Sequence, residues 1–231
     1  MKQPYLKKIG EISKWTVWAV DGQHIRTKIN EEFTNFGQHF RFPFIPKWEF
    51  WIDQEGAEGE TQFFIDHLLV EWRLMNKGCS YDHAVDKADA MEKQERAKSA
   101  LMRRVKKHLK KAIIPKELYR RKIMENRGLK VWIVSGELTR DLFFIDFTEG
   151  GHHFVYHFVP RAEVWIDDDV QAAERKFVIL HELHERYLMS QGLSYLRAHR
   201  SASHIEYECR HRPSLLRAKL KEEMKRNVNL A

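Results

Sequence analysis

Three side chains in the run VILHELHE, residues 178–185, have the types and the spacing of a metal site. In a helix, residues four apart project from one face, so His181 and Glu185 are expected to point together. Glu182 lies one position round the helix, where its carboxylate can hold a water beside a bound cation. Zinc accepts imidazole and carboxylate ligands, and catalytic zinc sites keep three protein ligands plus a water. The segment therefore predicts zinc bound by His181 and Glu185, with Glu182 as the general base.

A third ligand must come from another element, and the next predicted helix offers three polar side chains on one stripe. At positions i, i+4 and i+7 these are His199, Ser203 and Glu206. His199 is the preferred third ligand, and Glu206 is the second choice. A pair of ligands formed by His181 and His184 is a further alternative.

The elements that position these residues occur twice, because the chain repeats itself at a spacing of 114 residues without a gap. Val17-Trp18 recurs as Val131-Trp132, and Trp51-Ile52-Asp53 recurs as Trp165-Ile166-Asp167. This period is far too long for a solenoid repeat, so we expect two copies of one domain. The predicted domains are residues 1–112 and 115–231, because Pro115 can open the first helix of the second copy.

Each copy is predicted to be an α+β domain in which a small antiparallel sheet is followed by helices. In the second copy, turns are expected at Ser135-Gly136 and Gly150-Gly151. The expected strands are residues 131–134, 142–147, 153–159 and 163–166. The expected helices are residues 116–126, 171–190, 194–210 and 214–226.

The two copies differ at the predicted site. The first copy keeps His67 and Glu71 at the positions of the predicted ligand pair. It has apolar residues at three other positions: Leu68, Val70 and Val85 replace Glu182, His184 and His199. We therefore interpret the first copy as degenerate and inactive. Because the His/Glu pair persists there, a second interpretation stays open, in which these side chains only pair with each other and with Arg210.

The segment His181 to Glu185 resembles the HExxH helix of zincin metallopeptidases, with glutamate at the position of the second histidine. A strand ending in acidic residues, a Glu-Arg turn and an apolar helix with His-Glu also resemble the small metallopeptidase domain of ImmA-type phage and stress regulators. Bacterial and phage proteins are similar across residues 136–210. The resemblance implies a zincin-like fold, a zinc cofactor, His181 as ligand, Glu182 as base, and a peptide or protein substrate.

Composition favours a folded protein outside the membrane. Of the 231 residues 43% are hydrophobic, which is enough to form a core. No run of about 18 apolar residues is present, and the first residues show no apolar signal region. Cys79 and Cys209 are far apart and fit free thiols in a reducing compartment. We therefore expect a cytoplasmic protein without membrane contact.

The net charge of +7 is concentrated in a basic stretch before the second copy. Its cations include Arg103, Arg104, Lys106 and Lys107. Such a stretch can contact phosphates, so nucleic acid is an alternative partner, although no base-reading motif is present. A non-enzymatic scaffold or interaction protein of phage or bacterial origin is the other alternative to a peptidase.

Overall fold

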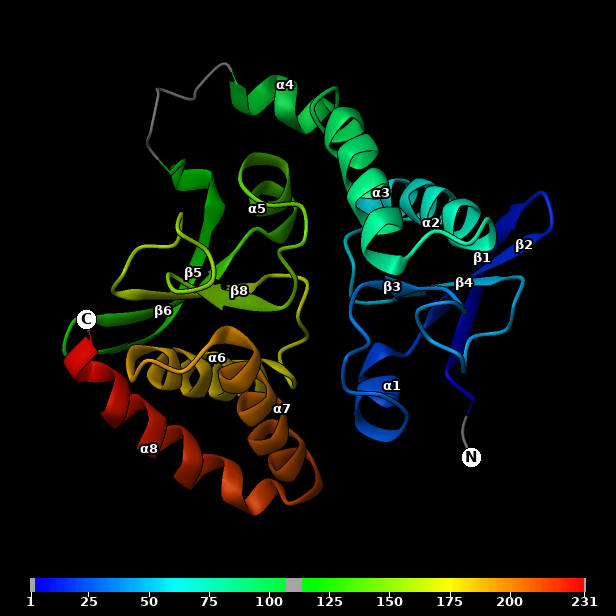
Figure 1. Ribbon diagram of the computed structural model, residues 1–231. Coiled ribbons are helices and arrows are strands. Elements are labelled where there is room, and N and C mark those ends of the chain that lie inside the picture. The colour runs from blue at the N-terminus through cyan, green and yellow to red at the C-terminus, as the bar shows by residue number, and fades with distance from the viewer. Residues whose placement is uncertain (1–2, 107–113, 231) are drawn as a thin grey trace. The chain divides into compact units, whose positions relative to one another are not determined.

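A computed structural model describes residues 3–106 and 114–230 of the chain. The chain divides into two compact units, one formed by residues 1–113 with 140–145 and the other by 114–139 with 146–231. The predicted boundary between Ala112 and Pro115 falls partly on residues 107–113, outside the described residues, and residues 140–145 group with the first unit. Each unit contains a four-stranded sheet followed by helices (Figure 1), which confirms the α+β class.

The second unit carries the predicted site. Its sheet has the strand order β5-β6-β8-β7, and α6, α7 and α8 lie together on one side of it (Figure 1). Its strands are β5 (Tyr119–Asn126), β6 (Leu129–Val134), β7 (Gly150–His152) and β8 (Glu163–Asp167). Its helices are α5 (Gly136–Leu142), α6 (Arg175–Ser190), α7 (Tyr195–His211) and α8 (Leu216–Asn227), with short 3-10 turns at Lys116–Leu118, Pro213–Leu215 and Val228–Leu230.

The first unit has the same topology, with the strand order β1-β2-β4-β3. Even the strand register agrees, because Val17 pairs with Phe50 as Val131 pairs with Val164. Its strands are β1 (Tyr5–Ile12), β2 (Trp15–Val20), β3 (Phe36–Gly37) and β4 (Glu49–Asp53). Its helices are α1 (Gly22–Lys28), α2 (Thr61–Asn76), α3 (Tyr81–Arg96) and α4 (Ala100–Lys106), with a 3-10 turn at Glu58–Glu60. The two copies thus match in topology, as the ungapped repeat predicts.

Each sheet is mixed, whereas the sequence predicts a small antiparallel one. The two central strands of each sheet, β2 with β4 and β6 with β8, run parallel, while the outer strands are antiparallel to their neighbours. Parallel neighbours need a crossover connection, and in the second unit residues 135–162 form it. The expected strands 142–147 and 153–159 lie within this crossover, outside the strands. Ile145 and Phe147 lie in a loop, and their side chains are buried. The apolar residues of this segment therefore reflect packing and not a strand.

The prediction of a helix at residues 116–126 was also wrong, because this segment forms a 3-10 turn and then β5. Arg127 and Gly128, with φ of 43° and 95°, form a two-residue hairpin turn, which favours residues that tolerate positive φ. The predicted turn at Gly150-Gly151 is strand β7, and the one at Ser135-Gly136 is the start of α5. The three expected C-terminal helices are present, with α6 starting at Arg175.

Successive side chains of the two central strands point to opposite faces of the sheet, and those on one face form the core of the second unit. Val131, Ile133, Val164 and Ile166 face α6 and α8, where Val178, Ile179, Leu183 and Met224 complete a buried cluster. On the opposite face Trp132 and Trp165 pack around Tyr119, whose hydroxyl donates to Glu163. Tyr5, Trp18, Trp51 and Glu49 repeat this arrangement in the first unit. The tryptophans that recur in both copies therefore pack with a tyrosine of β1 or β5 on this face of the sheet.

Cys79 and Cys209 are both free thiols. Within residues 3–106 and 114–230, the structure contains no helix with the length and apolar character needed to cross a membrane.

Candidate metal centre

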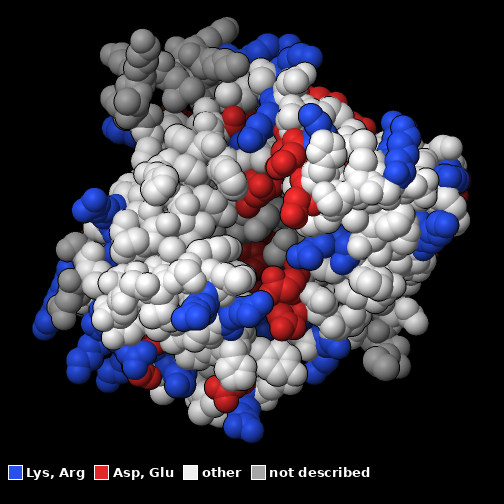
Figure 2. Space-filling view, in the orientation of Figure 1, with Lys and Arg blue, Asp and Glu red and all other residues white. Residues whose placement is uncertain are grey.

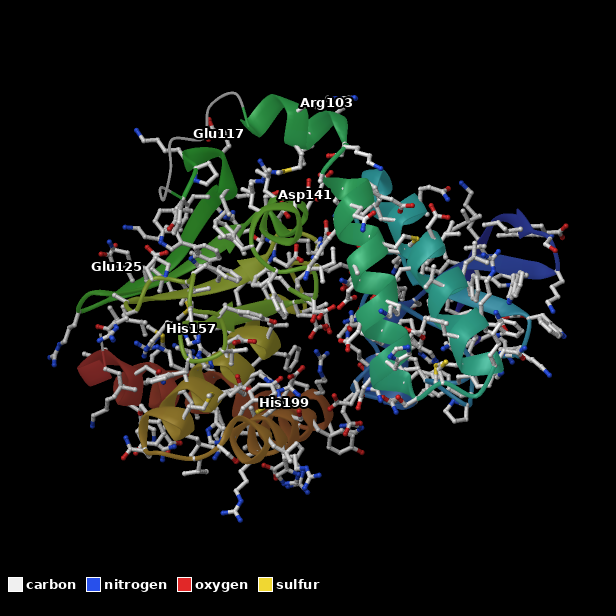
Figure 3. The ribbon with its side chains drawn as sticks, turned by 45° about the horizontal axis from the view of Figure 1, so that its top comes forward. Arg103, Glu117, Glu125, Asp141, His157 and His199 are labelled. Carbon is white, nitrogen blue, oxygen red and sulfur yellow. The ribbon has the colours of Figure 1, made fainter. Side chains whose placement is uncertain are left out.

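Helices α6 and α7 bring the three predicted ligands together. Nε2 of His181 lies 3.1 Å from Nδ1 of His199 and 3.7 Å from Oε2 of Glu185. That oxygen of Glu185 lies 2.9 Å from Nδ1 of His199, on α7 (Figure 3). Two ring nitrogens and one carboxylate oxygen therefore form a triangle with sides short enough for one cation to contact all three.

The local sequence explains why the two helices meet at this point. Gly192, with a φ of 89°, ends α6 in the left-handed conformation that glycine adopts readily, and α7 begins three residues later. The helices then pack through Leu180, Ile205 and Cys209, which are buried between them. This packing holds His181 opposite His199. The exposed fraction of the side chain is 29% for His199, 12% for His181 and 3% for Glu185, so the site opens to solvent beside His199.

The second nitrogen of His181 is held by a chain of charged side chains. Nδ1 of His181 lies 2.9 Å from Oε2 of Glu206, and Oε1 of Glu206 accepts hydrogen bonds from Arg210. Arg210 also forms an ion pair with buried Glu174. Metal-binding histidines commonly use the other ring nitrogen in this way, with a carboxylate that fixes the ring. Glu206 therefore orients His181, and His199 rather than Glu206 completes the triangle with Glu185.

His152, on β7, is a member of the site that the sequence did not suggest. Its Nε2 lies 3.1 Å from Oε1 of Glu185, and its ring is completely buried. In the first unit Gln38 occupies this position and donates its amide NH to Oε1 of Glu71. Because the glutamine nitrogen can only donate, the correspondence assigns the Nε2 proton to His152. The difference between Gln38 and His152 was the sequence signal that could have revealed this residue.

Glu182 is buried beside Glu185 and His152. A carboxylate oxygen of Glu182 lies within 4.8 Å of ligand atoms of His152 and Glu185. Burial and the charge of Glu185 raise its pKa to about 8. A cation in the site would lower that pKa again and leave Glu182 ready to accept a proton.

Gly150 makes room for this carboxylate. A Cβ at Gly150 would lie 3.1 Å from Cγ of Glu182 and 2.9 Å from the carbonyl oxygen of Trp165. In the first unit the equivalent residue is Phe36, whose ring packs against Phe64 and His67. The second unit therefore keeps space for a polar group where the first unit is filled by an aromatic ring.

The pKa values of His181, Glu185 and Glu206 depend on one another, because these side chains are in contact. Burial lowers the pKa of His181, but its interactions with the carboxylates of Glu185 and Glu206 outweigh burial and raise this pKa well above its usual value. Burial raises the pKa of Glu185, but hydrogen bonds from His152 and His199 and the nearby His181 lower it far below its usual value. For Glu206 the hydrogen bond and charge of His181 and Arg210 overcome burial and lower the pKa to about 2. Without a cation, a proton on His181 balances this set.

His184, the alternative ligand, and two further histidines of the second unit lie outside the triangle. Nδ1 of His184 lies 2.9 Å from Glu223 of α8, and its Nε2 lies 3.0 Å from Ser201, so His184 joins three helices. His153 and His157 lie in turns after β7 rather than on one strand. His157 is exposed (Figure 3). None of these three side chains joins the triangle of ligand atoms.

The first unit has the side-chain network that orients the histidine, but it lacks the rest of the site. Nδ1 of His67 lies 2.9 Å from Glu92, which is bonded to Arg96, and Arg96 pairs with Glu60. The missing parts are the third ligand and the base, because Val85 and Leu68 stand at those positions. The shared chain of charges is thus part of the fold of both units, and the second unit adds nitrogen and carboxylate donors to it.

Two other charged groups lie outside this centre. Asp167, Asp168 and Asp169 follow β8, and Asp168 accepts a hydrogen bond from the backbone of Gly136 at the start of α5. On α4, Arg103 is exposed (Figure 3), whereas the side chains of Arg104 and Lys106 and the whole of Lys107 lie outside the described residues. On the face drawn in Figure 2, Lys and Arg side chains are scattered over several separate areas.

Comparison of the chain with protein families, with curated proteins and with solved structures finds no match.

Proposed function

We propose that the second unit is a metal-dependent hydrolase with zinc as its cofactor and a peptide as its substrate. The observation that supports this most is the convergence of His181, Glu185 and His199, whose ligand atoms lie 2.9 to 3.7 Å apart. The donor set fits the metal, because zinc accepts two imidazoles and one carboxylate and leaves a fourth position open. The hydrogen bond from His181 to Glu206 supplies the outer support that such ligands have.

Zinc held by His181, Glu185 and His199 would supply a bound water with a pKa of about 7 and a Lewis acid for the substrate carbonyl. Glu182 takes the proton of that water and returns it to the leaving amine. His152 holds one oxygen of Glu185, so that the other oxygen stays directed at His181 and His199. The chain of Glu206, Arg210 and Glu174 keeps the ring of His181 in place.

The surface beside His199 supports a substrate with apolar side chains. Tyr195 stacks on the His199 ring with 5.3 Å between centroids. Leu193 and Leu196 lie next to it in the sequence, and all three are among the exposed large hydrophobic residues. The exposed ring of Tyr195 at the open side of the site suits a peptide better than a small, highly charged ester.

The alternative function is a non-enzymatic scaffold in which these residues form only an ion network. The first unit favours it, because His67, Glu71, Glu92 and Arg96 form such a network without a third ligand. The two functions differ in what Glu182 does, since a scaffold has no use for a base.

The variant Glu182→Gln separates them. We expect it to bind zinc like the wild type, because Glu182 is not a ligand, and to lose hydrolysis by at least about 100-fold, because the base is gone. The measurement is cleavage of a mixed peptide library by zinc-loaded protein, beside zinc content. Glu71→Gln in the first unit is the matched control and should leave cleavage unchanged. Wild-type protein that binds zinc but cleaves no peptide would favour the scaffold.

A further inference from the structure

Three tryptophans of the first unit form a cage that the second unit lacks. They are Trp15 at the start of β2, Trp48 just before β4, and Trp72 in α2. The equivalent residues of the second unit, 114 positions later, are Leu129, Ala162 and Arg186. The shared fold therefore does not require tryptophan at these three positions.

The three rings face a common point. The centroids of Trp15 and Trp72 lie 5.0 Å apart with nearly perpendicular planes, and Trp48 lies 5.2 Å from Trp72 and 6.0 Å from Trp15. The ammonium group of Lys14 sits among them, 3.7 Å from the centroid of Trp48 and 5.0 and 5.1 Å from the other two. A cation within about 6 Å of a ring centroid is attracted by the ring face. The cage thus holds a cation supplied by the chain itself.

This internal cation is poorly anchored. Lys14 is an exposed residue of the two-residue turn between β1 and β2, and no carboxylate among the described residues pairs with its ammonium. The cage itself is fixed, because Trp15 and Trp72 are buried in the core cluster of the unit. Trp48 is 38% exposed and forms the wall that faces solvent. An external cation can therefore compete with Lys14 for the ring faces from the solvent side, at Trp48.

We propose that this cage binds a small zwitterion with a trimethylammonium group beside an anionic group, as in phosphocholine. Quaternary ammonium groups are the cations that aromatic cages commonly recognise, because their weak hydration is easily given up to ring faces. The anion is assigned from Lys47, whose ammonium lies 5.2 Å from the centroid of Trp48. The chain carries a net charge of +7, which disfavours a ligand that is only cationic.

The test is calorimetric titration of the full chain with phosphocholine and, separately, with choline, which lacks the anion. We expect phosphocholine to bind more tightly than choline, and Lys47→Ala to remove that difference. Lys14→Ala should strengthen binding about threefold or more, because the internal competitor is gone. Trp48→Leu keeps an apolar side chain without an extended ring face and should weaken binding by about fivefold or more.

Lys7→Ala, which removes an exposed charge from the same hairpin, is the control and should leave binding unchanged. Absence of phosphocholine binding by both the wild type and Lys14→Ala at millimolar concentration would overturn the proposal. Equal affinity of the wild type and Trp48→Leu would do so too. Binding to phosphatidylcholine vesicles without binding of free phosphocholine would also overturn it and point to a lipid surface instead.

Discussion

At the scale of single residues, His152 decides how Glu185 is presented to the other ligands. Its Nε2 proton occupies Oε1 of Glu185, so that Oε2 is left for His181 and His199. Gln38 performs the same task for Glu71 in the first unit. Gln38 thus shows that glutamine can take the place of His152 in this fold.

We expect His152→Gln to bind zinc within about threefold of the wild type, because the amide donates the same hydrogen bond. His152→Leu should lose about 10- to 100-fold in affinity, which is typical when an outer partner of a ligand is removed. The measurement is competition for zinc with a chromogenic chelator. If glutamine weakened binding as strongly as leucine, His152 would be a ligand rather than a positioning residue.

His67 in the first unit has the same partners as His181 but no third ligand beside it. Burial lowers its pKa, but the hydrogen bonds and charges of Glu71 and Glu92 outweigh burial and raise the pKa to about 9. The folded state therefore binds this proton more tightly than the unfolded chain, whose histidine pKa is about 6.5. The resulting stabilisation is complete below about pH 6.5, is lost as the pH rises through about 9, and amounts to at most about 3 kcal/mol.

Urea unfolding at pH 7 and pH 10 measures this contribution. We expect the wild type to lose stability between these pH values and His67→Gln to lose less of it, because the contribution of His67 is removed while that of His181, whose pKa is also raised, remains. His83→Gln, at an exposed position of α3, is the control and should behave as the wild type does. A wild-type loss that persists unchanged in His67→Gln would show that other groups cause it.

Helix α8 holds α6, the helix that carries His181 and Glu185, through polar contacts of buried side chains. Arg186 of α6 is completely buried, and Asn227 at the end of α8 accepts its hydrogen bond at 2.8 Å. The amide NH₂ of Asn227 also donates to the carbonyl of Leu183 in α6. His184 and Glu223 make a second link between the two helices.

We expect Asn227→Ala to lower the free energy of unfolding by about 1–3 kcal/mol, because it leaves a buried charged donor without this acceptor. Lys225→Ala changes an exposed residue of the same helix and should stay within about 0.5 kcal/mol of the wild type. Chemical denaturation of the two variants gives the comparison. Equal effects would mean that Arg186 does not depend on α8.

Long periodic helices were predictable from the sequence, whereas short elements were not. The spacing in α6 and α7 predicted both helices and placed His181, Glu185 and His199 together, because a helix fixes which residues share a face. The charged segment 119–126 was predicted as a helix but is strand β5, because its partner β6 supplies the hydrogen bonds that its own pattern does not reveal. His152 was missed because a three-residue strand, β7, carries it. Its contact with Glu185 depends on a parallel crossover that periodicity cannot show.

At the scale of the whole molecule, the duplication separates what the fold needs from what one unit adds. In both units a histidine is linked through a glutamate and an arginine to a second glutamate. This network of side chains therefore serves the fold. The donors His199, His152 and Glu182 occur only in the second unit. We therefore expect a metal in the second unit only, while at the equivalent place in the first unit a proton on His67 balances the carboxylates.

The metal content of the wild type and of His199→Val, by elemental analysis after zinc addition and gel filtration, tests this most directly. The substitution gives the second unit the residue that the first unit has at this position, Val85, and removes one of three ligands. We expect about one zinc per wild-type chain and none in the variant, because catalytic zinc sites rely on three protein ligands. The same zinc content in both proteins, or none in the wild type, would contradict a metal centre formed by His181, Glu185 and His199.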